Sequence, residues 1–158
     1  MKNSYSLSTN CGSSEVNRKA TLLGYANMIL FACSSSSKLQ LRTLNYWISP
    51  AIDHNQIVFL FDSTGSPFGY VTWAYLASDA ENRLLNDTNF LLHPSEWNEG
   101  GQFWIIDFFF PYGGVKEAAR KLQSFFHSLG VYQVKWARRT SEYKVRKVFQ
   151  YNFSLAGS

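Results

Sequence analysis

The strongest constraint on the fold is an apolar segment, Phe103–Phe110, which reads FWIIDFFF and is interrupted only by Asp107. Its length is that of a typical strand, and aromatic and β-branched side chains favour extended structure. A half-buried strand would alternate apolar and polar residues, whereas this segment is apolar at both sets of alternate positions. It therefore predicts a central strand that needs a covering layer on each face.

The flanking patterns supply those layers. They predict, in chain order, a helix from Arg18, a helix over Lys38–Ile48 that stops before Pro50, a hairpin of Gln56–Phe61 and Phe68–Leu76, a short helix over Asp79–Leu85 capped by Ser78, the central strand, a helix over Val115–Leu129, and strands over Val131–Ala137 and Lys147–Phe153. This order predicts an α+β fold, an α/β sandwich with a mixed sheet and helices on both faces. It is also the order of the GNAT-like acyltransferase architecture, although an analogy of fold alone carries no chemistry.

The chain is 158 residues long, which is the size of one domain. Residues 1–17 are polar and predict a flexible N-terminal lead, so the single domain is expected over residues 18–158. The lead lacks the apolar core of a secretory signal, and no apolar run approaches the roughly 20 residues of a membrane span. We therefore expect a cytoplasmic protein without a membrane span. The two cysteines, Cys11 and Cys33, lack metal-ligand spacing, so no metal site is expected.

Positive charge is concentrated in the last third of the chain. Residues 116–158 hold nine Lys and Arg against two Glu, whereas residues 1–115 hold six against nine acidic residues. This asymmetry suggests an anionic partner such as an acidic protein, a nucleic acid or a membrane surface, unless the basic face is simply solvated. No RNP-like motif accompanies the aromatic residues of this segment, so no nucleic-acid partner is expected.

Asp107 is the one charged residue in the central strand. Strict alternation puts it on the same side as Phe103, Ile105 and Phe109, where a carboxylate is costly unless it is hydrogen-bonded, paired or protonated. One interpretation is a carboxylate that orients or deprotonates a catalytic partner. The other is a structural Asp bound to backbone amides or to a lysine, and position alone leaves both open.

A turn, Pro111-Tyr112-Gly113-Gly114, separates this strand from the helix that follows. At such a junction the N–H groups of Gly113, Gly114 and Val115 would point outward and favour a phosphate or an oxyanion. These three residues are therefore a candidate binding site. The alternative is a tight turn that needs the conformational freedom of glycine.

The other candidates for chemistry are histidines and serines. None of His54, His93 and His127 has a recognisable acid or nucleophile companion, which favours structural or surface roles. The run Ser34–Ser37 could hold a nucleophile, but it lacks the GxSxG pattern of a nucleophile elbow and is predicted as a loop.

Five segments, taken together, carry a resemblance to a known family. The strongest is Trp97–Gly113, which reads WNEGGQFWIIDFFFPYG, and the others are Leu23-Gly24, Ser49–Ile52, Gly69–Ala74 and Leu84–Asp87. In their order and spacing they resemble the toxin-activating lysine acyltransferases, which fatty-acylate RTX haemolysin precursors. The resemblance covers roughly residues 22–137.

This resemblance implies an acyltransferase-like domain of N-acyltransferase architecture. It implies acyl carrier protein as the donor, an acidic partner suited to the positive surface, with no other cofactor bound. The acceptor would be an internal lysine of a protein toxin, modified in the cytoplasm before export. The family's catalytic aspartate falls at Asp107, and its catalytic histidine position falls at Ser36, which leaves the general base unassigned. Gly113, Gly114 and Val115 would hold the thioester oxygen or the phosphopantetheine of the donor.

Two hypotheses follow. In the first, the chain is an enzyme that matures a ribosomally made toxin or bacteriocin by acyl transfer from acyl carrier protein to a lysine, with Asp107 as base or orienting group. In the second, it is a short microcin-maturation relative without the family's histidine. Such a subunit would work with a larger modification subunit to attach a siderophore-derived group to the C-terminal serine of the microcin precursor. A homodimer is a further candidate assembly.

Overall fold

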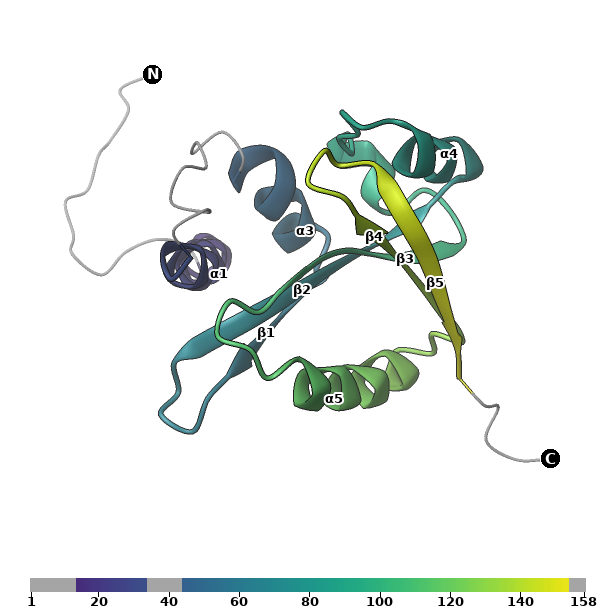
Figure 1. Ribbon diagram of the computed structural model, residues 1–158. Coiled ribbons are helices and arrows are strands. Elements are labelled where there is room, and N and C mark those ends of the chain that lie inside the picture. The colour runs from purple at the N-terminus through teal and green to yellow at the C-terminus, as the bar shows by residue number, and fades with distance from the viewer. Residues whose placement is uncertain (1–13, 34–43, 154–158) are drawn as a thin grey trace, which may run out of the picture.

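Five strands form one mixed sheet in the order β1-β2-β3-β4-β5 (Figure 1). The computed structural model describes residues 14–33 and 44–153. Neighbouring strands are antiparallel except β3 and β4, which run parallel. The strands are β1 (Ile57–Phe61), β2 (Pro67–Leu76), β3 (Gln102–Phe109), β4 (Gln133–Arg139) and β5 (Val145–Asn152). The predicted hairpin and central strand are thus confirmed to within a residue or two.

Helices cover both faces of this sheet, as predicted. α5 lies against one face, and α1, α3 and α4 lie against the other (Figure 1). The helices are α1 (Ser14–Phe31), the π-helix η2 (Leu44–Ile48), α3 (Ser49–Asp53), α4 (Ser78–Asn86), the 3₁₀ helix η3 (Pro94–Trp97) and α5 (Val115–Ser128). The architecture is therefore a mixed α+β sandwich.

Three predicted helix boundaries are wrong. α1 begins at Ser14, so the last four residues of the predicted lead are helical, and residues 1–13 lie outside the described residues. Of the helix expected over Lys38–Ile48, residues 38–43 lie outside the described residues. The described part continues through Pro50, because Pro50 lies in the first turn of α3, where its missing N–H is not needed. Ser78 does not cap α4, since Ala77 occupies the N-cap position without a side-chain hydrogen bond.

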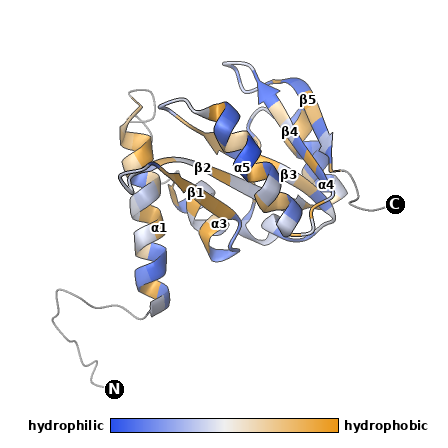
Figure 2. Ribbon diagram, turned by 90° about the horizontal axis from the view of Figure 1, so that it is seen from below, coloured by the Kyte–Doolittle hydropathy of each residue, from blue (hydrophilic) through white to orange (hydrophobic). Residues whose placement is uncertain are grey.

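The two faces of the central strands bury different sets of residues. Toward α5, Trp73 packs edge-on against Phe126 with ring centroids 5.4 Å apart. On the opposite face, Trp104 joins a cluster with α4, and Tyr70 joins a cluster with α1 and α3. Figure 2 shows that the C-terminal half of α1 is hydrophobic, whereas much of the β4–β5 hairpin is hydrophilic. The prediction of a central strand covered on both faces is confirmed.

Candidate functional site

A break in the β2–β3 pairing decides where Asp107 lies. Thr72 pairs with Asp107 and Trp73 pairs with Ile105, so Ile106 has no partner on β2. Such a bulge puts two successive residues on one face of the strand and reverses the alternation beyond it. The prediction that Asp107 lies on the same side as Phe103 and Ile105 is therefore wrong. Both of those residues pack in the cluster on the α5 side, whereas Asp107 faces α1 and α3.

The Asp107 carboxyl group is held by hydrogen-bond donors from three elements. The hydroxyl of Tyr70, which is 2% exposed, donates to Asp107 Oδ2 over 2.7 Å. The backbone N–H of Phe108 and the indole of Trp47 also donate to the carboxylate. Burial raises the pKa of Asp107 above its ordinary value of 3.8, and the three donors oppose that rise. The structural interpretation of Asp107 agrees with these contacts in part. A backbone amide binds the carboxylate, but its side-chain donors are Tyr70 and Trp47 and not a lysine.

Tyr70 remains a hydrogen-bond donor over the whole pH range in which the protein would work. Burial first, and then the neighbouring Asp107 charge, raise the pKa of its phenol well above the ordinary value of 10. Its ring packs against Phe59 and Phe109 at centroid distances of 6.1 and 5.7 Å. The hydroxyl is thus held in one place by aromatic packing, and it fixes the orientation of the carboxyl group.

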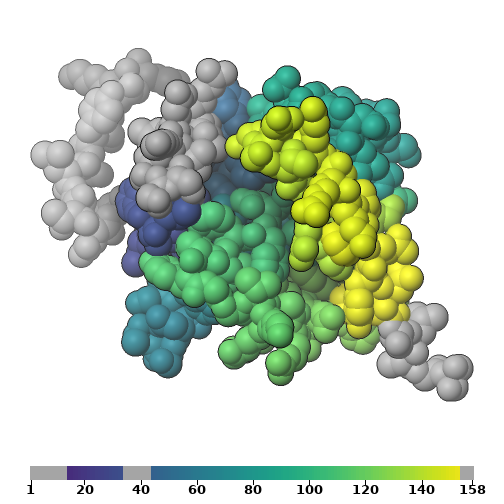
Figure 3. All heavy atoms as spheres, in the orientation of Figure 1, coloured from purple at the N-terminus to yellow at the C-terminus, as the bar shows by residue number. Residues whose placement is uncertain are grey.

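A cavity of about 580 Å³ opens beside Asp107, between β3 and β4. These two parallel strands pair at a single position, Trp104 with Lys135, and the cavity is lined by the residues that follow on each strand. α5 forms another wall, and Figure 3 shows a hollow between the atoms that follow β3 and the β4–β5 hairpin. The lining is mostly apolar with two arginines, and comprises Ile105, Ile106, Asp107, Phe108, Val115, Ala119, Leu122, Gln123, Phe126, Val134, Trp136, Ala137, Arg138, Arg139, Tyr151 and Phe153.

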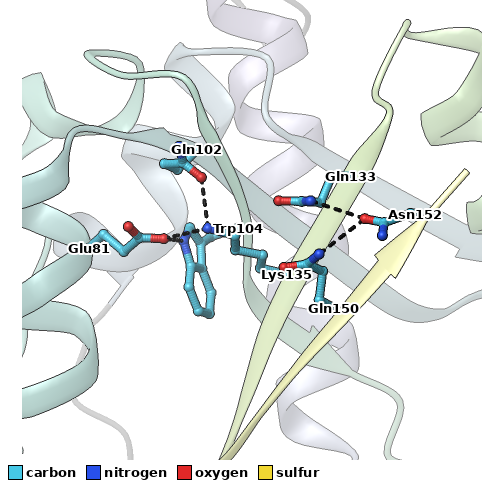
Figure 4. A network of polar contacts seen from close by, with 7 residues as sticks. All are labelled: Glu81, Gln102, Trp104, Gln133, Lys135, Gln150 and Asn152. Carbon is cyan, nitrogen blue, oxygen red and sulfur yellow. Dashed lines mark hydrogen bonds and ion pairs between the residues drawn. The ribbon is translucent and has the colours of Figure 1, made fainter.

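A polar network lies at the one position where β3 and β4 pair, Trp104 with Lys135. Lys135 Nζ lies 2.8 Å from Glu81 Oε1 and 2.7 Å from Gln102 Oε1, and the Trp104 indole donates to the same Glu81 oxygen over 2.8 Å (Figure 4). Burial alone would raise the pKa of Glu81, but the hydrogen bonds from Lys135 and Trp104 outweigh it and lower that pKa. The network therefore ties β3, β4 and α4 together where the strands begin to diverge.

Sequence reasoning did not identify this network. Glu81 and Lys135 are 54 residues apart along the chain. In its own segment of the sequence, each looks like an ordinary charged residue exposed to solvent. One signal was available, because a central strand that is apolar on both faces indicates a sheet with a layer on each side. A charged residue on the neighbouring strand β4, such as Lys135, could therefore be expected to be partly covered.

The turn before α5 adopts the conformation that its glycines allow. Gly113 and Gly114 have φ angles of +86° and +79°, and Gly114 is the N-cap of α5. The Gly113 N–H donates to the carbonyl of Phe110 over 3.2 Å, so the expectation that it points outward is wrong. Val115 does line the cavity, and the turn therefore lies at its edge.

Residues 15–152 of the chain match the model of the RTX toxin acyltransferase family. The chain belongs to this family. A 66-residue segment is 41% identical to the RTX-II toxin-activating lysine-acyltransferase ApxIIC of Actinobacillus pleuropneumoniae and covers 42% of this chain and 40% of that protein. A 79-residue segment is 30% identical to the protein-lysine myristoyltransferase RtxC of Kingella kingae, over 50% and 46% of the two chains.

A longer match links the chain to the leukotoxin-activating lysine-acyltransferase LtxC of Aggregatibacter actinomycetemcomitans. It is 26% identical over 155 residues and covers 89% of this chain and 91% of that protein. The segments matched to ApxIIC and to the myristoyltransferase span less than half the length of those relatives. Family membership rests on the match over residues 15–152.

The structure describes Asp107, at which the family's catalytic aspartate falls. Ser36, at which the family's catalytic histidine position falls, lies outside the described residues. The histidines have the structural roles that the sequence favours. His54 Nε2 lies 2.9 Å from the carbonyl of Pro94, and His93 caps η3 together with Glu96. None of the three histidines lines the cavity.

Two findings about metal binding and membrane spanning apply to the described residues. Over residues 14–33 and 44–153, no group of three or more His, Cys, Asp and Glu side chains could hold a metal ion. In the same ranges, no helix is long and apolar enough to cross a bilayer.

Proposed function

We propose that this chain transfers a fatty-acyl group from acyl carrier protein to a lysine of a toxin precursor. The observation that carries the proposal is the apolar cavity between β3 and β4 with Asp107 among the residues that line it. Membership of the RTX toxin acyltransferase family supports the reaction type. The parallel pair β3–β4, joined at one position and then diverging, supports a GNAT-like architecture.

The cavity suits the acyl chain of the donor. Its volume lies within the range of about 300–1,000 Å³ typical of ligand sites, and its walls are mostly aliphatic and aromatic. Each methylene group moved from water into such walls is stabilised by about 0.8 kcal/mol. A long acyl chain therefore gains most of its affinity here from burial rather than from specific polar contacts.

The phosphopantetheine arm and its carrier protein suit the basic rim of the cavity. Arg138 lines it and pairs across the β4–β5 ladder with Lys147, whereas the guanidinium of Arg139, which also lines it, donates to the carbonyls of Leu84 and Tyr143. Guanidinium groups bind phosphate through charge-assisted hydrogen bonds, and Gly114 and Val115 begin α5, whose positive end favours the same group. This arrangement supports an acidic, phosphate-bearing donor on this side.

Asp107 would act on the acceptor lysine. In the transfer step the lysine amine attacks the thioester carbon, a C–N bond forms, and the C–S bond breaks. The nitrogen loses a proton to Asp107, the pantetheine sulfur departs as the thiolate, and the proton held by Asp107 then passes to that sulfur, which gives the free thiol and restores the carboxylate. Because none of the three histidines lines the cavity, we assign the role of general base to Asp107.

The test is reconstitution from purified components. The chain, myristoyl acyl carrier protein and the RTX-II toxin precursor are incubated, and the precursor is digested for mass spectrometry. The expected result is a myristoyl mass on a lysine peptide, lost by a factor of about 10²–10⁴ in initial rate in Asp107→Asn. A wild-type rate for Asp107→Asn, in a reaction that does modify lysine, would rule out Asp107 as the base.

The microcin alternative predicts other results from the same material. It requires a stable complex with a larger modification subunit on co-expression, and it requires modification of a C-terminal serine rather than a lysine. A lysine adduct formed by the purified chain alone would exclude it. In either case we propose that the reaction takes place in the cytoplasm, before the precursor is exported, and size-exclusion chromatography tests the homodimer.

A further inference from the structure

A buried hydroxyl group lies directly across the sheet from Asp107. Thr72 pairs with Asp107 in the β2–β3 ladder, next to the bulge at Ile106. Side chains of directly opposed residues point to the same face, with Cβ atoms about 4.5–5.5 Å apart. Thr72 is 0% exposed, and its Oγ1 has no hydrogen-bond partner among the described residues.

An unpartnered buried hydroxyl group is costly, so its presence beside a functional carboxyl group needs a reason. A valine of nearly the same shape would fill the position without that cost. In the resting state Asp107 accepts hydrogen bonds from Tyr70, Phe108 and Trp47, and therefore already has its donors. All three groups donate to the carboxylate in this arrangement, so the O–H that forms when it takes up a proton needs an acceptor.

We propose that Thr72 is a positioning residue whose hydroxyl oxygen accepts a hydrogen bond from Asp107 once this carboxyl group is protonated. The inference rests on the proposed function, in which Asp107 receives the proton of the acceptor lysine. The lysine nitrogen loses the proton, Asp107 gains it, and the new O–H bonds to Thr72 Oγ1. Thr72 thereby stabilises the protonated product of the proton transfer without touching the substrate.

Thr72 is the group on this face whose capacity to accept is unused. The Trp47 indole can only donate, and the Tyr70 hydroxyl, which donates to Asp107, would have to reverse its hydrogen bond to accept from it. The residues that α1 brings to the same cluster, Ala26, Ile29 and Leu30, are apolar. On the cavity side, the charged and titratable groups that line the same cavity are those of Arg138, Arg139 and Tyr151. Arginine has no acceptor.

The test compares Thr72→Val with Thr72→Ser and follows Asp107 by ¹³C NMR of carboxyl-labelled aspartate. The Asp107 resonance is identified as the one missing in Asp107→Asn. We expect Thr72→Val to lower the pKa of Asp107 by about 0.5–1, the equivalent of one net hydrogen bond, and Thr72→Ser to leave it unchanged. An unchanged pKa in Thr72→Val contradicts the proposal. A raised pKa also contradicts it, because it would mean that Thr72 donates to the carboxylate.

Two further measurements separate this proposal from a structural role and from the proposed function. Thr72→Val should unfold at the same temperature as the wild type or higher, since it removes an unpartnered polar atom. The acid limb of the pH–rate profile for lysine acylation should move down with the pKa in Thr72→Val and stay in place in Thr72→Ser. If the wild-type chain acylates no lysine, the proposed function fails, whereas the NMR titration still decides whether Thr72 stabilises protonated Asp107.

Discussion

The hydrogen bond from Tyr70 to Asp107 should be worth more when the carboxyl group is charged. Tyr70→Phe removes the hydroxyl that lies 2.7 Å from Asp107 Oδ2 and leaves the ring between Phe59 and Phe109. A hydrogen bond to a charged group contributes about 1.5–3 kcal/mol, and one between neutral groups about 0.5–1.5 kcal/mol. We therefore expect Tyr70→Phe to cost about 1 kcal/mol more in free energy of unfolding where Asp107 is ionised than where it is protonated.

The sign of the pH dependence follows from the raised pKa of Asp107. An acid whose folded pKa exceeds its unfolded value contributes stability that is fully present below the unfolded pKa, here 3.8, and is lost as the pH rises through the folded pKa. Tyr70 opposes the rise, so its removal raises the pKa of Asp107 further. The loss of stability with rising pH should therefore be larger in Tyr70→Phe than in the wild type.

Urea denaturation of both proteins from about pH 4 to about pH 8 measures this difference. Tyr132→Phe is the matched control, because Tyr132 is 63% exposed and its hydroxyl should contribute less than about 0.5 kcal/mol at any pH. If the cost of Tyr70→Phe in free energy of unfolding is the same across the pH range, the hydroxyl does not distinguish the two protonation states of Asp107.

Three further substitutions test how the structure around the site is stabilised. Lys135→Met leaves the Glu81 carboxylate partly buried without its ion-pair partner. It should lower the free energy of unfolding in urea by about 1–3 kcal/mol, and adding Glu81→Gln should recover part of that loss. Gly100→Ala places a Cβ against the Leu76 backbone and should cost about 1–3 kcal/mol or more, whereas Gly101→Ala, with open space around it, should not. In Gly114→Ala the new Cβ makes only an ordinary contact, 3.6 Å from Phe68 Cε2, but the left-handed φ should cost about 1–2 kcal/mol in thermal unfolding, and an equal Tm would contradict the strain argument.

The parts of the fold that sequence could predict are those determined by local pattern. The Phe103–Phe110 run predicts a strand buried on both faces, and the β1–β2 hairpin follows from two apolar runs around Asp62–Pro67. In that turn the Asp62 carboxylate accepts from the backbone N–H groups of Thr64 and Ser66 over 2.8 and 3.0 Å. Such side-chain-to-backbone bonds between near neighbours leave a clear trace in sequence.

The parts that sequence could not predict depend on which strands pair. The bulge at Ile106 exists because β3 carries one more residue than the facing stretch of β2, and this count becomes visible only once the register is known. It moves Asp107 to the face opposite the one that alternation predicts. The Glu81–Lys135 ion pair likewise depends on the parallel placement of β4 beside β3. Both features decide the geometry of the site, which explains why Asp107 could be singled out from sequence while its surroundings could not.

The most direct measurement of the central claim is to locate the acyl chain of the donor. Acyl carrier protein loaded with a fatty-acyl chain bearing a terminal diazirine is bound to the chain, irradiated and digested for mass spectrometry. We expect cross-links to residues that line the cavity, such as Leu122 of α5 and Trp136 of β4. We also expect Trp136→Ala to change the pattern of cross-links. Cross-links confined to α1 or to the β1–β2 hairpin would contradict the account, because the acyl chain would then lie outside the gap between β3 and β4.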